Sequence, residues 1–570
     1  RRIYGEARVG GHPVYQGSPV SVGNFQQVTV FACHEVTEIR TVFIGERAIY
    51  DTDLDADGYA TGSRWTKTWQ TGSAGYLAIW KKLGAAGQTA FDSLIARSNG
   101  EWTADHKLTG HAAVHTEFSW EENIYAGGLP NVSAVIRGAK VYDTRDATTK
   151  CTPNAALVIR DFFLTAKTEL GLDADTDEIS DAEWSSAANV CDEIVATPTT
   201  GDAAVMHTVV AFDPSAGTVE LDGDVLKLQW GDRFEFATDG ALPTGLSAAT
   251  AYYAIPVRDR KTESEAGRRV AIRVASSLAN AYAATAASFS GTGSGTATIT
   301  KTGEPRWTIN GSFTSDQNPR NVLEEMLASC GMRVPYSYGQ FRPMGLAWEA
   351  PTLSLDESDL RGPLKVSTKR PQRDRFNALK GTYVNPANDW QPSDYPALAP
   401  AAYEAADGER IFNDFDQPYT SRSGQAQRAA KLELARNRFE RVVSVPALLT
   451  AYDCKAGDAI GLSNDRWEWS DKSFEVIERR PVIEDGDEDE GPYLGIDLVG
   501  NETSEDIYDW ASTEEQADPP VYVPTLPDWK TVAAPGAPEV AESLYEGRDG
   551  SDVKAQVTLT WIASTSGLVT

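Results

Sequence analysis

Residues 154–193 decide the fold class and read NAALVIRDFFLTAKTELGLDADTDEISDAEWSSAANVCDE. In the first half, apolar side chains recur at helical spacing after Asn154, which is a favourable helix N-cap residue, and the repeat stops at Gly171. In the second half, Ser180 and Glu183 are spaced as a capping box in front of a second helical pattern. The stretch therefore predicts two consecutive helices.

The residues before these helices predict strands. β-Branched runs occupy residues 28–32 and 40–44, and residues 132–137 (VSAVIR) form a further strand pattern directly upstream of Asn154. We expect residues 1–128 to form a β-rich domain. We expect an α+β domain over residues 129–196 that resumes at residues 304–345, where Asn318, Pro319 and Gly331 bound another helix.

The composition changes between residues 196 and 304, that is, between the two segments of the expected α+β domain. Residues 197–303 are rich in Thr, Ala, Gly and Ser, and they contain strand patterns at 225–230 and 233–236 and a hairpin-like edge at 291–300. This composition predicts a small all-β module inserted into the α+β domain.

The C-terminal half repeats the mixture of helix and strand. The clearest helix of the chain covers residues 423–439, and we expect it within an α+β domain of residues 346–450. Strand patterns that follow predict a β-barrel-like domain at 451–530. Residues 531–570 are expected to form a linker and the start of a β-sandwich. The predicted fold is thus a β-rich, multidomain α+β protein.

Length and charge limit the function. A chain of 570 residues is expected to fold as about three to six domains, and no run approaches the roughly 18 apolar residues of a membrane span. The formal net charge is −30, from 52 basic and 82 acidic residues. Such a chain repels nucleic-acid phosphates, which argues against specific DNA binding but not against a surface past which DNA slides. Arg1 leads straight into a strand pattern, so we expect a fragment of a longer chain.

The cysteines predict no metal ribbon and no redox motif, because no CxxC occurs. We expect free, buried thiols in a reducing compartment. The five residues are Cys33, Cys151, Cys191, Cys330 and Cys454.

One segment has the beginning of a calcium loop. Asp53, Asp55 and Asp57 precede Gly58 in a D-x-D-x-D-G pattern, but Arg64 occupies the position at which a calcium loop needs a bidentate Glu. The alternative is a polar turn that uses Asp and Gly for their turn geometry, and we favour it.

A histidine group and a basic group are the other candidate sites. His106, His111 and His115 lie close in sequence, yet no ligand set completes them, so we expect surface or interface histidines. A basic cluster is either a contact with an acidic neighbouring subunit or a solvated strand edge, and we favour the subunit contact. The cluster comprises Lys369, Arg370, Arg373, Arg375 and Lys380.

The motifs of common enzymes are missing from the sequence. We find no G-x-S-x-G elbow, no P-loop and no dinucleotide-binding glycine pattern at a strand–helix turn. We therefore predict no catalytic residues, no cofactor and no enzymatic activity. A glycosidase-type acid pair could not be chosen among 82 acidic residues.

Four stretches, in this order, resemble the phage tail-tip protein J family of lambda-like host-specificity proteins. They are residues 126–143 (AGGLPNVSAVIRGAKVYD), 188–193 (ANVCDE), 304–311 (EPRWTING), and 373–384 (RDRFNALKGTYV) with 388–392 (NDWQP). The resemblance covers about residues 1–530 except 197–303.

Two further resemblances lie outside this pattern. Residues 240–253 (GALPTGLSAATAYY) are similar to short β-modules of phage tail-fibre proteins, and residues 535–561 resemble the first strands of a fibronectin type III domain with Trp561 as its core residue.

The family resemblance implies a baseplate-hub-like fold and a structural role in a virion. It implies a homotrimer at the distal end of the tail, assembled in the host cytoplasm, that closes the tail tube and anchors the central fibre. The implied partners are the distal tail protein, other tail-tip proteins, the tape measure protein and a host cell-surface receptor. DNA would pass during genome delivery without specific binding.

Two alternatives stay open from the sequence. The first is the equivalent hub of a gene transfer agent. The second is a secreted β-rich adhesin or carbohydrate-active enzyme, which predicts a signal peptide upstream.

Overall fold

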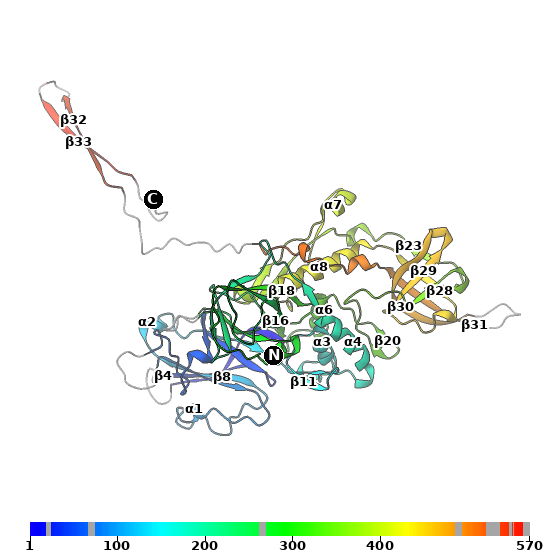
Figure 1. Cartoon of the computed structure of the whole chain (residues 1–570), viewed down its shortest axis with the longest axis horizontal. Coiled ribbons are helices and arrows are strands. Elements are labelled where there is room, and N and C mark those ends of the chain that lie inside the picture. The colour runs from blue at the N-terminus through cyan, green and yellow to red at the C-terminus, as the bar shows by residue number, and fades with distance from the viewer. Residues whose placement is uncertain are drawn as a thin grey trace. The chain divides into compact units, whose positions relative to one another are not determined.

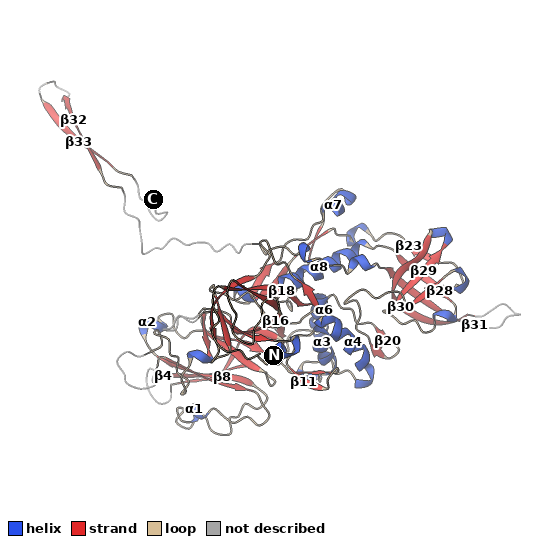
Figure 2. Ribbon diagram, viewed as in Figure 1, coloured by secondary structure: helices blue, strands red, loops and turns tan. Residues whose placement is uncertain are grey.

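The computed structural model describes residues 1–18, 24–66, 75–261, 269–484, 493–519, 536–546, 550 and 552–562. The chain divides into two compact units, Arg1–Pro519 and Pro520–Thr570. Figures 1 and 2 show strands and helices mixed through the first unit, which confirms the β-rich α+β class. Among the described helices, none has the length and apolar character needed to cross a membrane.

Two four-stranded antiparallel sheets form the N-terminal part. One has the order β2 (Glu6–Gly10), β9 (Val132–Arg137), β5 (Glu38–Ile44) and β6 (Arg47–Tyr50). The other has the order β3 (His12–Gly17), β4 (Asn24–Ala32), β8 (Ala112–Ser119) and β7 (Leu77–Leu83). Phe31, Val42 and Val114 belong to the core that both sheets share. The expected boundary at residue 128 falls inside the first sheet, because β9 lies between β2 and β5.

Four helices share the largest core of the first unit. They are α3 (Ala155–Leu164), α4 (Asp181–Asp192), α6 (Pro319–Cys330) and α8 (Ser423–Arg438). Asn154 caps α3 through a hydrogen bond from the backbone N–H of Leu157 to its side chain (3.2 Å), as expected. The helix ends at Leu164 and not at Gly171, since Thr165 adopts an extended backbone.

The predicted capping box before α4 is wrong. Ser180 is the N-cap residue by position, but within the described part of the chain its side chain makes no capping hydrogen bond. Glu183 instead accepts hydrogen bonds from Arg342 at 3.1 Å, so its carboxylate is not available to the N-cap backbone.

The stretch between α4 and α6 contains a closed six-stranded antiparallel barrel. The strands in order are β13 (Met206–Asp213), β14 (Thr218–Leu221), β17 (Ala271–Ala275), β16 (Ala251–Arg258), β15 (Arg233–Thr238) and β18 (Ala297–Pro305). β18 closes the barrel because it pairs with both β13 and β15. Its last residues also pair with β12 (Ile194–Ala196), which joins the barrel to α4. The strand expected at residues 225–230 is wrong: this segment is irregular, with Leu226 and Leu228 buried in the barrel core.

A six-stranded sheet forms the other end of the first unit. Its order is β22 (Leu353–Leu355), β29 (Ala459–Asn464), β30 (Trp469–Glu484), β31 (Tyr493–Glu502), β28 (Val442–Ala447) and β23 (Lys365–Ser367). The expected boundary between residues 450 and 451 falls inside this sheet, because β28 pairs with β31.

Short elements complete the structure. Next to α8 lie β24 (Ala378–Lys380), β25 (Thr382–Asn385), β26 (Gln391–Asp394), α7 (Ala401–Asp407) and β27 (Phe412–Asp414). Elsewhere are β1 (Arg2–Tyr4), α1 (Asp92–Ile95), α2 (Glu122–Tyr125), β10 (Val141–Asp143), β11 (Thr148–Lys150), α5 (Leu278–Tyr282), β19 (Gly311–Phe313), β20 (Tyr336–Ser337) and β21 (Gln340–Phe341).

The second unit is described as a hairpin of β32 (Glu539–Glu546) and β33 (Val553–Thr560). Register pairs such as Val540 with Leu559 place apolar side chains on one face. The described hairpin alone does not test the expected start of a fibronectin type III domain, which stays a prediction. Residues 520–535, which include the beginning of the expected linker, lie outside the described residues.

Candidate functional site at helix α8

The aspartate motif at residues 53–58 forms a turn. The carboxylate of Asp55 accepts hydrogen bonds from the backbone N–H groups of Asp57 (3.0 Å) and Tyr59 (2.8 Å), which closes a turn. Asp53 is 4% exposed and accepts a hydrogen bond from the backbone of Tyr50. No three His, Cys, Asp or Glu side chains among the described residues gather to hold a metal ion, and the calcium hypothesis stays a prediction.

The expectation for the histidines is wrong for His115. This residue is fully buried on β8, its ring stacks on Trp80 with centroids 4.7 Å apart, and it exchanges hydrogen bonds with Ser93 and Gln26. Burial lowers its pKa to about 3. The expectation of buried thiols is likewise wrong for Cys33, which is exposed, whereas the other four cysteines are buried and free.

The side chains of the basic cluster are mostly exposed, and several form ion pairs within the chain, among them Arg373 with Asp374 at 3.3 Å. Arg375 pairs with Glu440 at 2.8 Å, and Lys380 lies 3.6 Å from Asp414. Lys369 and Arg373 are exposed. A subunit contact through this cluster stays a prediction.

Buried charges gather where the barrel meets the first turn of α8. Arg422, the residue before α8, donates to Asp232 of the barrel at 3.1 Å, and Lys301 of β18 lies 2.7 Å from Glu304. Arg428 of α8 contacts the other oxygen of Glu304 at 2.8 Å. All five side chains are at most 9% exposed. Because each charge has an opposite partner, the cluster can be ionised inside the protein.

The electrostatics of this cluster favour its ionised state. Burial alone would raise the pKa of Glu304, but the charges of Lys301 and Arg428 lower it to about 2. Burial lowers the pKa of Lys301, but Asp232 and Glu304 outweigh this effect and raise it above its usual value. We call these five residues, Asp232, Lys301, Glu304, Arg422 and Arg428, the buried charge cluster.

A second set of buried contacts holds the barrel against the N-terminal sheets. Arg40 of β5 bridges Glu6 and Asp259, the latter at 3.1 Å, and the hydroxyl of Tyr50 also donates to Asp259. The guanidinium of Arg137 lies 3.7 Å from the ring centroid of Trp230. The barrel is therefore fixed on two sides by charged and aromatic contacts.

The last segment of the first unit runs antiparallel along α8. We call residues 507–518 the strap. Lys431 contacts Glu514 (2.7 Å), Gln427 exchanges two hydrogen bonds of 2.9 Å with the backbone of Gln516, and Ser423 donates to Asp518. Ser423, Gln427 and Lys431 are spaced by four residues and thus lie on one face of the helix. Asp518 also places a negative charge at the helix N-terminus, which the helix dipole favours.

A cavity of about 300 Å³ lies between the strap, the barrel and the start of α8. Its lining includes Arg40, Lys301, Glu304, Arg422 and Glu515. Arg40 Nη1 and Glu515 Oε2 are buried without a hydrogen-bond partner among the described residues. Burial, followed by the charge of Glu304, raises the pKa of Glu515 to about 7.

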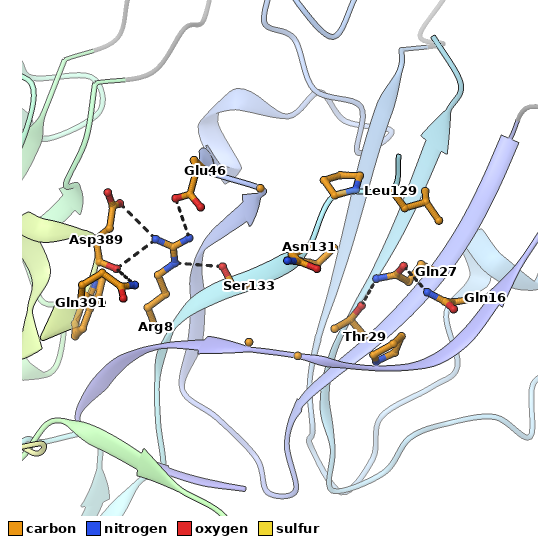
Figure 3. Close-up of a pocket in the computed structure, with 17 residues that line it drawn as sticks. Arg8, Gln16, Gln27, Thr29, Glu46, Leu129, Asn131, Ser133, Asp389 and Gln391 are labelled. Carbon is orange, nitrogen blue, oxygen red and sulfur yellow. Dashed lines mark hydrogen bonds and ion pairs between the residues drawn. The ribbon is translucent and has the colours of Figure 1, made fainter. Parts of the chain in front are cut away.

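A second pocket, of about 560 Å³, lies between the N-terminal sheets and residues 389–391. Figure 3 shows the residues that line it. The side chain of Arg8 donates to Ser133 at 3.2 Å and contacts Asp389 and Glu46, while Gln16 and Gln27 lie on the opposite side. Its lining is mainly polar, so it suits a hydrophilic ligand.

Sequence patterns did not identify the α8 junction. Arg422 and Asp232 are 190 positions apart, and neither belongs to a recognisable motif. The one available signal was the occurrence of Glu304 inside the stretch EPRWTING, which the family resemblance had highlighted.

Comparison with known proteins points to phage tails. A family model described as "Putative phage tail protein" matches residues 318–477. The baseplate hub protein pb3 of Escherichia phage T5 is 26% identical over 236 residues, which cover 39% of this chain and 23% of that protein. The match thus spans under a quarter of the relative's length.

Solved structures with a likeness to this chain share little sequence with it. A chain in the virion of a native gene transfer agent has a TM-score of 0.46 and 13% identity, over 90% of this chain and 87% of that chain. The 43 kDa tail protein of prophage MuSo2 from Shewanella oneidensis has a TM-score of 0.23 and 10% identity, over 54% of this chain and 94% of that chain. These structural likenesses assign no function. By its sequence, the chain is a relative of structural proteins of phage tails and baseplates.

Proposed function

We propose that this chain is the hub of a phage tail tip, of the kind found in the protein J family. In this role it forms a homotrimer on the tail axis, closes the tail tube and anchors the central fibre. It binds the distal tail protein and other tail-tip proteins, meets the tape measure protein, and takes part in receptor engagement and genome delivery. It works mechanically, with no catalytic step of its own.

The observation that carries the proposal is the family match at residues 318–477. This range begins at α6, contains the whole of α8 and ends within β30, so it includes the helix on which the barrel and the strap converge. The low-identity relative is itself named a baseplate hub protein, which supports a hub in particular.

The charge of the chain supports passage of DNA without specific binding. A net charge of −30 repels phosphates, so a ring of such subunits would let the genome slide through after opening. Opening needs an interface with two arrangements.

The test is to mix the purified chain with the distal tail ring of its particle and to measure masses by mass photometry. Trimers bound to the ring are expected. Monomers alone, with or without the ring, would contradict the hub proposal. The equivalent hub of a gene transfer agent differs in the packaged DNA, so sequencing the DNA of the particles separates the two cases.

A further inference from the structure

The strap contacts α8 in an order that allows it to be peeled. Counting from its C-terminal end, Asp518 contacts Ser423 and Tyr383, Gln516 contacts Gln427, and Glu514 contacts Lys431. Lys431 also donates to the carbonyl of Asp509 at 2.7 Å and lies 5.8 Å from the centroid of the Trp510 ring. A pull on Pro519 therefore acts first on Asp518 and reaches the next contact only after that one has broken. Contacts that break one at a time yield at lower force than contacts that must break together.

The contacts of residues 511–518 are polar and partly exposed to water, and the half-buried Trp510 adds one aromatic contact with Lys431. Lys431 and Glu514 keep 25% and 39% of their side chains exposed, and such pairs contribute little net stability because water replaces them readily. Under the strap lies the polar cavity of about 300 Å³, and Glu515 leaves one buried oxygen without a partner among the described residues. Releasing the strap from this polar surface therefore costs less free energy than releasing it from an apolar core would.

The N-terminal end of the strap is held differently. Ile507 is 3% exposed and belongs to the largest hydrophobic core, and Tyr508 packs beside it. The guanidinium of Arg436 lies 5.7 Å from the centroid of the Tyr508 ring. Peeling that began at Asp518 would thus meet an apolar anchor and stop there.

We propose that the strap is a release element: tension from the C-terminal side peels residues 509–518 off α8, while Ile507 and Tyr508 hold the chain to the core. The freed segment lengthens the connection to the second unit without unfolding the first. Ten extended residues at about 3.4 Å each span roughly 34 Å. The hub function supplies the source of the tension, so this inference rests on the proposed function only in that respect.

The test applies force to the full chain through handles at its two termini in an optical trap. A reversible lengthening on the order of 30 Å is expected at a force below that which unfolds the rest of the first unit. Gln427→Ala removes both hydrogen bonds to Gln516 and is expected to lower the release force. Glu433→Ala, on α8 but outside the strap contacts described above, is the matched control and should leave the force unchanged.

Hydrogen exchange of the full chain separates the strap from a general loss of folding. In Gln427→Ala, amides of residues 509–518 are expected to exchange about tenfold faster, and those of α3 to be unchanged. The proposal is overturned if the strap lengthens only together with unfolding of the first unit. It is also overturned if its amides are as protected as those of α8, or if both variants act alike. Neither measurement uses the particle, so a failed strap and a failed hub assignment are distinguishable.

Discussion

Arg422 and Asp232 form an ion pair of 3.1 Å in which the side chains are 2% and 0% exposed. The pair connects the start of α8 to the barrel, across 190 positions of sequence. Arg422 also donates to the carbonyl of Trp230 and to the hydroxyl of Thr308, so each of its three side-chain nitrogens has an acceptor.

Removal of Asp232 is expected to destabilise this junction strongly. Asp232→Ala leaves the Arg422 guanidinium buried without its ion-pair partner. Such a loss typically lowers the free energy of unfolding by about 3–5 kcal/mol. The change is measured as a lower midpoint of the first thermal transition of the full chain. The double variant Asp232→Leu with Arg422→Leu is expected to recover part of the loss.

The control for this prediction is a pair nearer the surface. Arg306 and Glu193 are 2.8 Å apart with side chains 23% and 52% exposed. Glu193→Ala is expected to lower the free energy of unfolding by at most about 1 kcal/mol. Equal effects of Asp232→Ala and Glu193→Ala would show that the buried pair does not hold the barrel to α8.

The docking of the strap is expected to weaken as pH rises. The docked pKa of Glu515, about 7, lies above the usual value near 4.5, so the docked state binds the proton more tightly than the released state. The contribution of Glu515 protonation to the stability of the docked strap is complete below about pH 4.5 and is lost as pH rises to about 7. The groups facing Glu515 are Glu304 and Lys301 of β18, Arg428 of α8 and Asp232 of the barrel.

Glu515→Gln removes this titration. Exchange of the strap amides, corrected for the intrinsic effect of pH, should accelerate by at least about tenfold between pH 5 and 7.5 in the natural chain. It should stay nearly constant in the variant. Glu505→Gln changes an exposed carboxyl near the strap and should behave like the natural chain. Parallel pH profiles for the natural chain and Glu515→Gln would refute this account.

A methyl group at Gly424 is expected to displace the strap. A Cβ there would lie 3.0 Å from a carboxylate oxygen of both Glu304 and Glu515. Glu304 is fixed by Lys301 and Arg428, so Glu515 is the side chain that must move. Gly424→Ala should therefore speed exchange of the strap, although Ala in a helix normally gains about 1 kcal/mol over Gly.

Gly87→Ala is the matched control, because nothing lies within 4 Å of its added Cβ. It is expected to leave strap exchange unchanged. If Gly424→Ala protects the strap instead, the helix preference outweighs the close contact and this reasoning fails.

Acid is expected to destabilise the N-terminal sheets through His115. Its pKa of about 3 in the fold lies below the usual value near 6.5, so the folded state resists protonation. The loss of stability therefore begins as pH falls below about 6.5 and is complete near pH 3. His115→Gln, which cannot be protonated, should flatten this part of the thermal stability profile. An unchanged slope in the variant would contradict the assignment.

Local patterns in the sequence determined several helices closely. Asn318, Pro319 and Gly331 predicted α6 to the residue, and α8 was expected one residue longer than it is. Such boundaries depend on neighbouring residues: a capping side chain, a proline without an N–H, or a glycine that adopts a left-handed backbone. The composition of residues 197–303 likewise predicted strands, and most of the barrel lies in this range.

Only the tertiary structure decided how these elements join. The barrel closes because β18 pairs with β13 and also with β15, and no local pattern specifies which distant strands meet. The candidate site arises in the same way: Asp232, Glu304, Arg422 and Glu515 come together from separate parts of the chain. Their charges are tolerated in the interior only because folding supplies partners for them, and a single sequence does not state which partner each charge will meet.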